Sequence, residues 1–394
     1  MRRKKKRLKR KVKRLFLLAI ILIVAGITIS VWPSFNKKSE PKKQKKEVKI
    51  EEKEKKLSVI AVGDALIHST VYMDAKQSDG SYDFKPMLQY IKPIVKDYDL
   101  RYYNQETILG GTELGLSNYP MFNSPQEVGD AFMDAKFNLV SLATNHTMDK
   151  GETGVTKSVE YWSKQKKVVW DGQRTSAEER EKTRVYKKNG IKYAFFSYTT
   201  WTNGLETPVG KEYLNNVYSE EKAKADIEKV RDEVDIIIVA MHWGTEYSLD
   251  VSADQEKIAK YLSDLGVNVI IGAHPHVVEP VEYVGDTLVI YSLGNFISDQ
   301  LGTERLTGLM FAFDITVKEK GEEKSIKVDN LRADLLYTKH NNAKNFRVYP
   351  YSELTNEILP NYMEYYNTYK GVVLSRNQDI TFGSLRKEWW YGNS

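Results

Sequence analysis

Five of the six histidines in the chain follow short apolar runs that read as buried strands. Only His340 lies elsewhere. Acids and amides accompany several of these histidines. The polar residues at the expected strand ends are, in chain order, Asp64 and His68, Asn104 and Glu106, Asn145 and His146, His242 and Glu246, and His274 and His276. Imidazole, carboxylate and amide groups in such a set indicate a metal site.

The spacing within two of these pairs suits metal coordination. Residues two apart on an extended segment point to the same side, so Asn104 with Glu106, and His274 with His276, can each offer two donors together. Pro275 restricts the backbone between the two histidines. Neutral imidazole suits zinc, iron and manganese, and carboxylate oxygens suit manganese and harder ions. The set would hold one or two divalent ions, and two ions bridged by a carboxylate would clamp the reacting oxygens of a hydrolysis.

Each pair also has a structural explanation when it is taken alone. A single histidine at a strand end is more often a hydrogen-bonded structural residue than a ligand. Gly63-Asp64 alone would be a turn, and the segment 104–107 alone would be a helix cap. The repeated placement at successive strand ends favours the metal site over these alternatives.

The strands and helices that would position these residues alternate along the chain. Seven apolar runs predict strands, and four segments between them have helical spacing with Ser, Asp or Gly at their starts. The strands are expected at residues 57–63, 137–144, 191–199, 234–241, 267–273, 287–294 and 308–317, and the helices at 124–136, 150–165, 219–233 and 252–266. The alternation predicts an α/β domain. Ligands of open α/β sheets bind at the carboxyl ends of the strands, where the polar pairs are expected.

The charge of the chain is divided unevenly along its length. Residues 1–14 hold eleven Lys and Arg and no acid, and residues 37–56 hold ten Lys and five Glu, so the first 56 residues carry +16. Because the whole chain carries +6, residues 57–394 carry −10. A domain of this charge is poorly suited to a phosphate backbone, so nucleic acid is excluded as the expected partner.

Residues 15–32 form an uncharged apolar run of eighteen residues behind the basic block. This length is close to the ~20 residues that cross a bilayer, and the positive-inside rule keeps the basic end cytoplasmic. A cleaved signal peptide is the alternative, but no Ala-x-Ala-like site follows. The Lys/Glu-rich segment after the run reads as a solvated stalk. We therefore expect a single-pass protein of the cell membrane with an extracellular domain, and the absence of Cys fits a Gram-positive type of surface.

The ordered motifs of the chain resemble those of a known family, the CapA (PgsA) capsule-synthesis family of bacterial poly-γ-glutamate proteins. The resemblance covers roughly residues 57–300. Its motifs are Gly-Asp (63–64), Asn-x-Glu-Thr (104–107), Asn-His (145–146), His-Trp-Gly-x-Glu-Tyr (242–247), Gly-x-His-Pro-His (272–276) and Tyr-Ser-Leu-Gly-Asn-Phe (291–296). The resemblance implies a four-layer α/β/β/α sandwich of the calcineurin-like metallophosphoesterase type, preceded by one transmembrane helix. The family is associated with making or exporting poly-γ-glutamate.

The resemblance also implies roles for individual residues. Asp64 looks like the first metal ligand, with a part in catalysis, and His146 looks like the proton donor or transition-state stabiliser. The other expected ligands are Glu106 as the bridging carboxylate, Asn145, His242, His274 and His276. The expected substrate contacts are Asn104, His68, Glu246 and Asn295. Metallophosphoesterases usually place a histidine two residues after the first Asp, whereas here His68 comes four residues after it.

Two classes of function follow from this reading. The first is a surface-anchored, metal-dependent hydrolase or transferase that acts on poly-γ-glutamate or another anionic envelope polymer. The second is a non-catalytic accessory subunit that uses the site to hold the membrane synthase or its polymer. Phosphodiester hydrolysis is a third hypothesis, and it rests on analogy of fold alone. The expected segments are a basic tail (1–14), a transmembrane helix (15–32), a stalk (33–56), the main domain (57–323) and a C-terminal extension packed on it (324–394).

Overall fold

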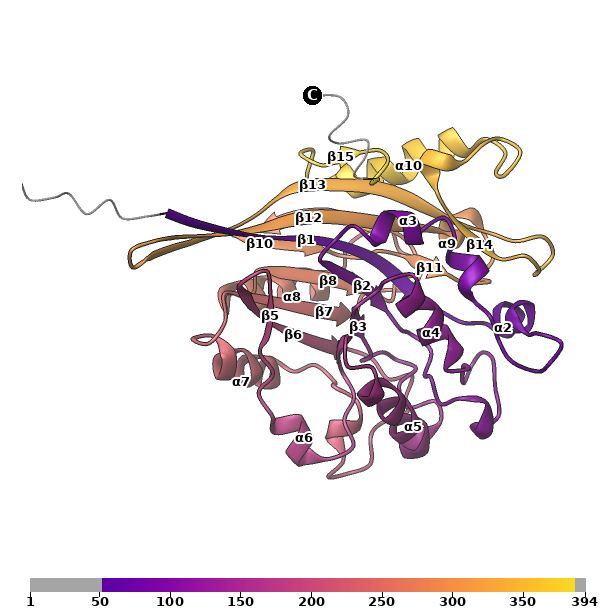
Figure 1. The fold of residues 1–394 in the computed structure, drawn as a ribbon, viewed down its shortest axis with the longest axis horizontal. Helices are drawn as coiled ribbons and strands as arrows, with labels where there is room; N and C mark the ends of the chain where they lie inside the picture. The colour runs from indigo at the N-terminus through magenta and orange to yellow at the C-terminus, as the bar shows by residue number, and fades with distance from the viewer. Residues whose placement is uncertain (1–51, 387–394) are drawn as a thin grey trace, which may run out of the picture. The chain divides into compact units, whose positions relative to one another are not determined.

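Two β-sheets form the centre of the computed structural model, which describes residues 52–386 (Figure 1). The nine-stranded sheet has the order β14 (Arg347–Pro350), β13 (Glu323–Lys339), β12 (Thr307–Lys320), β1 (Glu52–Ala65), β2 (Leu100–Asn104), β3 (Leu139–Ser141) and β4 (Val169–Asp171), with β11 (Asn295–Ile297) paired to β1 and β15 (Thr381–Phe382) paired to β13. The six-stranded sheet has the order β5 (Tyr186–Lys188), β6 (Ile191–Thr199), β7 (Ile236–His242), β8 (Val269–Ala273), β10 (Thr287–Ile290) and β9 (Val281–Val284).

Each sheet contains a parallel set of strands, and the two sets end near one another. Strands β1 to β4 are parallel, and so are β6, β7, β8 and β10. Asn104 ends β2 in one sheet and His242 ends β7 in the other, and the Asn104 Nδ2 and His242 Nδ1 atoms are 3.3 Å apart. The carboxyl ends of both parallel sets therefore adjoin, which is where α/β sheets usually hold ligands.

The core lies between the two sheets and continues on their outer faces. Along β1, Val59 and Ala61 belong to the cluster that joins the sheets, while Ile60 and Val62 belong to the cluster under the outer helices. A strand with period-two alternation buries both sets of side chains only when both faces of its sheet are covered. This double burial explains why the run 57–63 has no polar face.

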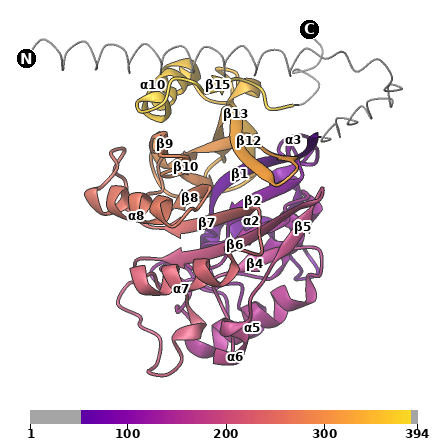
Figure 2. The same cartoon turned by 90° about the vertical axis from the view of Figure 1, so that its left-hand side faces the viewer.

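Helices cover the outer face of each sheet (Figures 1 and 2). The nine-stranded sheet is covered by α2 (Ser69–Ala75), α3 (Lys92–Val95), α4 (Glu127–Asp134) and α5 (Gly151–Lys164), and the six-stranded sheet by α7 (Glu220–Val230) and α8 (Ala253–Asp264). The remaining helical elements are α6 (Ala177–Glu181), α9 (Thr303–Leu306), α10 (Tyr362–Leu374), η1 (Lys85–Leu88), η2 (Thr112–Leu114), η3 (Glu212–Leu214) and η4 (Tyr351–Glu353). Ser219 and Ser252 cap α7 and α8 as expected, Ser252 through a capping box with Gln255.

The close approach of Gly63 to the backbone of Gly294 holds the end of β1 against β11. A Cβ atom at Gly63 would lie 1.7 Å from the carbonyl oxygen of Gly294, so only glycine fits there. The next residue, Asp64, donates its backbone N–H to the same Gly294 oxygen at 3.0 Å. The absence of a side chain at position 63 therefore sets the position of Asp64.

The predicted mixed α/β class is confirmed, with seven strands and four helices where the alternation placed them. The strand that we expected from residue 57 begins at Glu52 instead, so residues 52–56 of the expected stalk belong to the domain. The reason is pairing with β12, where Lys55 contacts Glu319 at 2.7 Å and Glu54 contacts Lys318 at 3.1 Å. Opposite charges on neighbouring strands let a highly charged segment join a sheet.

The segment expected as a C-terminal extension contributes β13, β14, β15 and α10. Strand β13 pairs with β12 along its length, and α10 joins the core between the sheets through Tyr369 and Val373. Within residues 52–386, no helix is long and apolar enough to cross a membrane. The expected basic tail and transmembrane helix, residues 1–32, lie outside the described residues.

Candidate metal centre

Polar side chains from both sheets meet at the adjoining strand ends. Asp64, Asn104 and His242 lie at the carboxyl ends of β1, β2 and β7. The remaining polar residues lie in the loops that follow β2, β3 and β8. The six expected metal ligands form one connected group and are all buried: Asp64, Glu106, Asn145, His242, His274 and His276. The structure therefore brings together residues that are spread over more than two hundred positions of the sequence.

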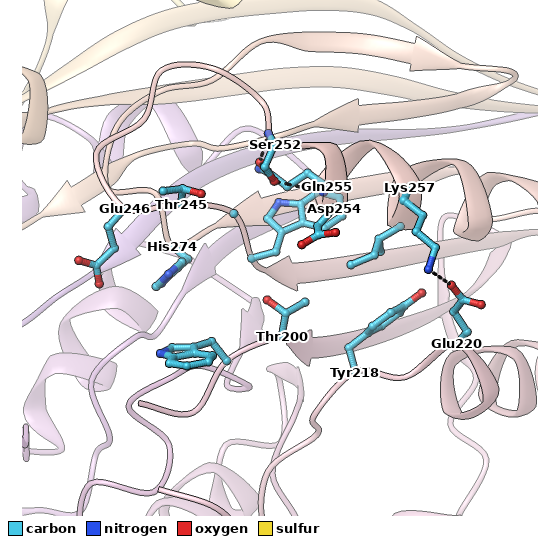
Figure 3. A pocket seen from close by; sticks show the side chains of 14 residues that line it. Thr200, Tyr218, Glu220, Thr245, Glu246, Ser252, Asp254, Gln255, Lys257 and His274 are labelled. Atoms are coloured by element: carbon cyan, nitrogen blue, oxygen red, sulfur yellow. Dashed lines mark hydrogen bonds and ion pairs between the residues drawn. The ribbon is translucent and has the colours of Figure 1, made fainter. Parts of the chain in front are cut away.

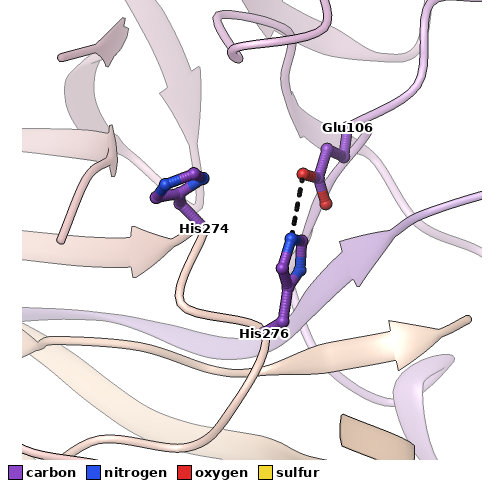
Figure 4. Close-up of side chains that lie close together, drawn as sticks. All are labelled: Glu106, His274 and His276. Atoms are coloured by element: carbon purple, nitrogen blue, oxygen red, sulfur yellow. Dashed lines mark ion pairs between the residues drawn. The ribbon is translucent and has the colours of Figure 1, made fainter. Parts of the chain in front are cut away.

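Glu106 lies at the middle of this group. Its Oε1 atom is 3.6 Å from His276 Nε2 and 3.8 Å from His242 Nε2, and the latter atom is 2.9 Å from Asn145 Oδ1. Donor atoms of Glu106, His274 and His276 all lie within 4.8 Å of one another (Figure 4). Ligands of one transition ion lie about 2.0–2.2 Å from it, so donors spaced in this way can share an ion.

Among residues 52–386, several buried donor atoms of the group have no hydrogen-bond partner. They are both carboxylate oxygens of Glu106, Nδ1 of His274 and Oδ1 of Asn104. Buried polar groups are nearly always hydrogen-bonded, and an unpaired buried charge is costly. A divalent cation would satisfy these atoms together, and so the residues present fit a metal ion.

The lowered pKa values of two buried histidines support the same conclusion. Burial lowers the pKa of His274 to about 3, with a smaller effect from His276, and burial and His274 hold the pKa of His242 well below its usual value. These two rings are therefore neutral and keep lone pairs for a cation. Burial raises the pKa of Glu106 well above its usual range, although His276 opposes this change. Burial lowers the pKa of His276, but Glu106 and Asp64 outweigh it and raise the pKa to about 9.

The backbone conformation that places His274 and His276 in this group differs from the expectation. The segment was expected to be extended, but both residues adopt positive φ angles, 98° and 61°. Positive φ is uncommon for residues with a side chain and costs of order 1–3 kcal/mol each. A tight turn after β8, and not strand alternation, places the two rings 5.9 Å apart between centroids.

Asp64 and Asn104 support the turn and the ligands around it. Asp64 Oδ1 accepts from Asn104 Nδ2 at 2.8 Å, and its Oδ2 accepts from the backbone N–H of His274 at 3.3 Å. Oδ2 also lies 3.5 Å from His276 Nδ1. Asn104, expected as a substrate contact, thus lies among the candidate ligands, and its Oδ1 faces no protein donor.

His146 stands beside the donor group with its own carboxylate partner. Its Nδ1 atom lies 2.8 Å from Asp149 Oδ2, and Asp149 also accepts the backbone N–H of Phe122 at 2.6 Å. The phenyl ring of Phe122 packs edge-on against the imidazole at 4.7 Å. A carboxylate at Nδ1 fixes the ring orientation and tautomer, which prepares the other nitrogen to transfer a proton.

Three expected substrate contacts have other surroundings. Asn295 is buried, and both polar atoms of its side chain already have partners in the protein. Its Oδ1 lies 3.1 Å from His276 Nδ1, and its amide donates to Gln300 and to the Arg305 carbonyl. It therefore orients a candidate ligand. His68 accepts from the Asp299 backbone N–H at 3.2 Å and packs on Phe122, the ring that also packs against His146. Glu246 is exposed and lines a cavity that also contains His274.

Sequence reasoning missed the residues that hold the others in place. Asp149 lies three positions after His146, and a carboxylate at that spacing was the signal that could have found it. Asn203 accepts from the amide of Asn145 at 3.2 Å, and Arg305 lies over the ring of Tyr247, 5.0 Å from its centroid. The Asn145–Asn203 and Tyr247–Arg305 contacts join loops that are far apart in the sequence, so no local sequence pattern indicates them.

Comparison with known families places this geometry in context. A family profile described as "Bacterial capsule synthesis protein PGA_cap" matches residues 58–300. The chain belongs to this family. All candidate ligands of this PGA_cap chain, from Asp64 to His276, lie inside the matched segment, together with His146 and Asp149. Arg305 and the strands β12 to β15 follow it.

Two curated relatives are capsule proteins. The chain is 28% identical over 254 residues to "PGA biosynthesis protein CapA" of Bacillus subtilis (strain 168), covering 62% of this chain and 64% of that protein. It is 26% identical over 295 residues to "Capsule biosynthesis protein CapA" of Bacillus anthracis, covering 72% of this chain and 67% of that protein. The match thus spans about two thirds of the length of these relatives.

Solved structures with a similar fold include two nucleotidases. One is a putative 5'-nucleotidase from Staphylococcus aureus in complex with alpha-ketoglutarate (15% identity, TM-score 0.44, covering 75% of this chain and 54% of that one). The other is the NAD nucleotidase NadN of Haemophilus influenzae (13% identity, TM-score 0.44, covering 86% and 67%). These distant similarities say nothing about the chemistry of the centre in the PGA_cap chain, which is inferred from contacts within the chain itself.

Proposed function

We propose that this PGA_cap protein is a metal-dependent hydrolase or transferase that acts on poly-γ-glutamate, or another anionic polymer of the envelope, during capsule synthesis or export. The observation that carries the proposal is the buried donor group around Glu106, whose oxygens have no hydrogen-bond partner among residues 52–386, next to the His146–Asp149 pair. A ligand group beside a positioned acid–base residue is the arrangement that metal-assisted hydrolysis requires. The names of the two Bacillus relatives support the polymer class.

The residues have separate tasks in this proposal. Glu106, Asn145, His242, His274 and His276 would hold the ion, and the fold analogy adds Asp64 in a metallophosphatase-like sandwich. Zinc, manganese or iron fits such donors. When bound, the ion would polarise the carbonyl or phosphoryl oxygen of the substrate. His146, fixed by Asp149, would hold and transfer the proton at its Nε2 atom.

The sequence supports a place for this activity at the cell membrane. The apolar run 15–32 behind a basic block favours a single-pass anchor with the domain outside, on a Gram-positive type of surface. Synthase subunits in the same membrane, and the polymer that they make, would then be the partners.

A non-catalytic accessory subunit is the second candidate. Two observations favour it: Nδ1 of His68 already accepts from the Asp299 backbone N–H, and both oxygens of Asp64 already contact the protein. A centre that lacks one ligand could hold an ion for structure alone, while the domain binds the synthase or its polymer.

The variant His146→Ala separates these two functions. An enzyme should lose about 10²–10⁴-fold in rate when its general acid is removed, with the metal retained. We therefore expect a deletion strain that expresses His146→Ala to make no capsule polymer, although the protein is folded and metal-loaded by melting temperature and elemental analysis. Glu106→Ala should lose metal and function together. Full complementation by a folded His146→Ala protein would falsify the catalytic proposal.

A further inference from the structure

A cavity of about 640 Å³ opens beside the candidate centre (Figure 3). It lies between the segments that follow β6 and β7 and the first turns of α7 and α8. His274 is part of its wall, and so the cavity is continuous with the donor group. Its volume falls in the range of about 300–1,000 Å³ that is usual for sites of small ligands.

The walls of the cavity combine aromatic surface with carboxylates. Trp201, Tyr218 and Trp243 supply the aromatic surface. Trp201 is 60% exposed, although an indole ring of this size is usually covered. The hydroxyl of Tyr218 is buried and has no partner in the protein. An open aromatic ring and an unpaired buried hydroxyl in one cavity are features of a binding site.

The charges in the wall are mainly negative. The carboxylates are Glu220, Glu246 and Asp254, and the cation is Lys257, which pairs with Glu220 at 3.0 Å. Glu246 and Asp254 therefore leave an excess of negative charge among the side chains that line the cavity. Carboxylates close to aromatic faces form the environment that favours an ammonium group, by ion pairing and by cation–π attraction.

A cation lies over Tyr247, the residue that follows the cavity-lining Glu246. Arg305 lies over the ring of Tyr247, and that ring is 6.0 Å from the ring of His276. Arg305 also contacts the half-buried carboxylate of Glu304 at 3.2 Å, while its Nε atom has no hydrogen-bond partner among residues 52–386. The donor group thus has an acidic aromatic cavity at His274 and a guanidinium paired with Glu304 near His276.

From this distribution we propose that the cavity binds an ammonium-bearing group of the substrate, namely the free amino end of the polymer chain. The proposal rests on the proposed function, because it concerns the substrate of the same centre. The carboxylates of a polyanion would be repelled by Glu246 and Asp254. The protein would therefore engage its polymer at the amino end and leave internal linkages alone.

The test compares two ligands that differ only at the amino end. A γ-linked tetramer of glutamate with a free amino group and its N-acetylated counterpart are titrated calorimetrically into the purified, metal-loaded full chain. We expect the free amine to bind about tenfold more tightly, since one charged contact is worth roughly a factor of ten. Glu246→Gln and Asp254→Asn should each reduce this preference about threefold, as expected for partly exposed charges, and the double variant should abolish it.

Asp264→Asn is the matched control, because Asp264 lies at the other end of α8, pairs with Lys260 at the surface, and does not line the cavity. It should leave the preference unchanged, and melting temperatures report folding. Equal affinity of the metal-loaded protein for both tetramers, or binding of neither, would overturn the proposal. The proposed catalytic function is judged separately by His146→Ala, so the two failures are distinguishable.

Discussion

His146 and His274 are both buried imidazoles, and their neighbours give them different chemistry. Asp149 holds Nδ1 of His146 at 2.8 Å, so this ring has a fixed orientation. Nδ1 of His274 has no protein partner, and burial keeps the ring neutral with a pKa of about 3. A fixed ring suits proton transfer, and a neutral ring with a free lone pair suits a metal ion.

The variant Asp149→Asn tests the role of the carboxylate. The amide cannot hold the imidazole in the same tautomer, and we expect activity to fall about 10–100-fold while the metal content stays constant. Glu152→Gln is the control, since Glu152 pairs with Lys211 at the surface nearby. A metal-free Asp149→Asn protein would show that the residue supports the ligands and not His146.

The double variant His274→Ala, His276→Ala tests the donor group. Removing two ligands leaves too few to complete a coordination shell, so we expect elemental analysis to find no bound divalent ion. His340→Ala should keep its metal, because His340 lies apart from the donor group, near Asp299. An unchanged metal content in the double variant would assign both histidines a structural role only.

The sequence located the candidate ligands better than it located the residues that support them. Ligands follow strands, and apolar runs reveal where strands end, so Glu106 and His242 could be found by position alone. The backbone turn at His274 was not visible, because positive φ is rare for histidine and the local pattern looked extended. Contacts such as Asn145 with Asn203 depend on how loops meet, which no periodicity encodes.

At the scale of elements, the ends of strands determine where the ligands lie. The predicted strands and helices of the α/β alternation were found because their periods are strong, whereas the pairing of residues 52–56 with β12 depends on a partner more than 250 positions away. Strand β1 carries Asp64, and its position depends on the contact of Gly63 with Gly294. Small changes at such contacts should therefore affect the centre.

Gly63→Ala tests this dependence. The added methyl group would clash with the Gly294 carbonyl and push β1 from β11, and overpacking of this kind costs about 1–3 kcal/mol. We expect a lower free energy of unfolding in denaturant and weaker metal binding. Gly371→Ala in α10 has open space around it and should be neutral or stabilising. Equal stability of wild type and Gly63→Ala would contradict the steric argument.

Strand β13 carries a buried carboxyl that predicts a pH dependence. Burial raises the pKa of Asp334 to about 7, and hydrogen bonds from Ser352 offset only part of this change. An Asp in an unfolded chain titrates near ~3.9. Between about pH 4 and 7 the folded state therefore keeps a proton that the unfolded state has released, and stability falls as pH rises.

The variant Asp334→Asn should remove this part of the pH dependence. At pH 8 it should be more stable than the wild type by no more than about 4 kcal/mol, and the difference should shrink towards pH 4. Urea unfolding of both proteins across this range measures it. Parallel curves for the two proteins would show that Asp334 does not titrate in this interval.

For the whole molecule, charge and hydropathy divide the chain into a basic, apolar N-terminal part and an acidic domain. A reporter that is active only outside the cell, fused after Asn36, should be active if residues 15–32 anchor the protein. The mature protein should also keep its basic N-terminus by mass spectrometry. Recovery of a soluble form that begins near residue 33 would support the signal peptide instead.

The donor group is divided between the two sheets, and this division links metal supply to folding. Glu106 and Asn145 follow strands of one sheet, and His242, His274 and His276 follow strands of the other. Each sheet contributes only part of the donor group. An ion that binds only the docked sheets stabilises the native state by mass action, in proportion to the logarithm of its free concentration. At the extracellular location proposed above, the domain would then draw part of its stability from the metal content of the surrounding medium.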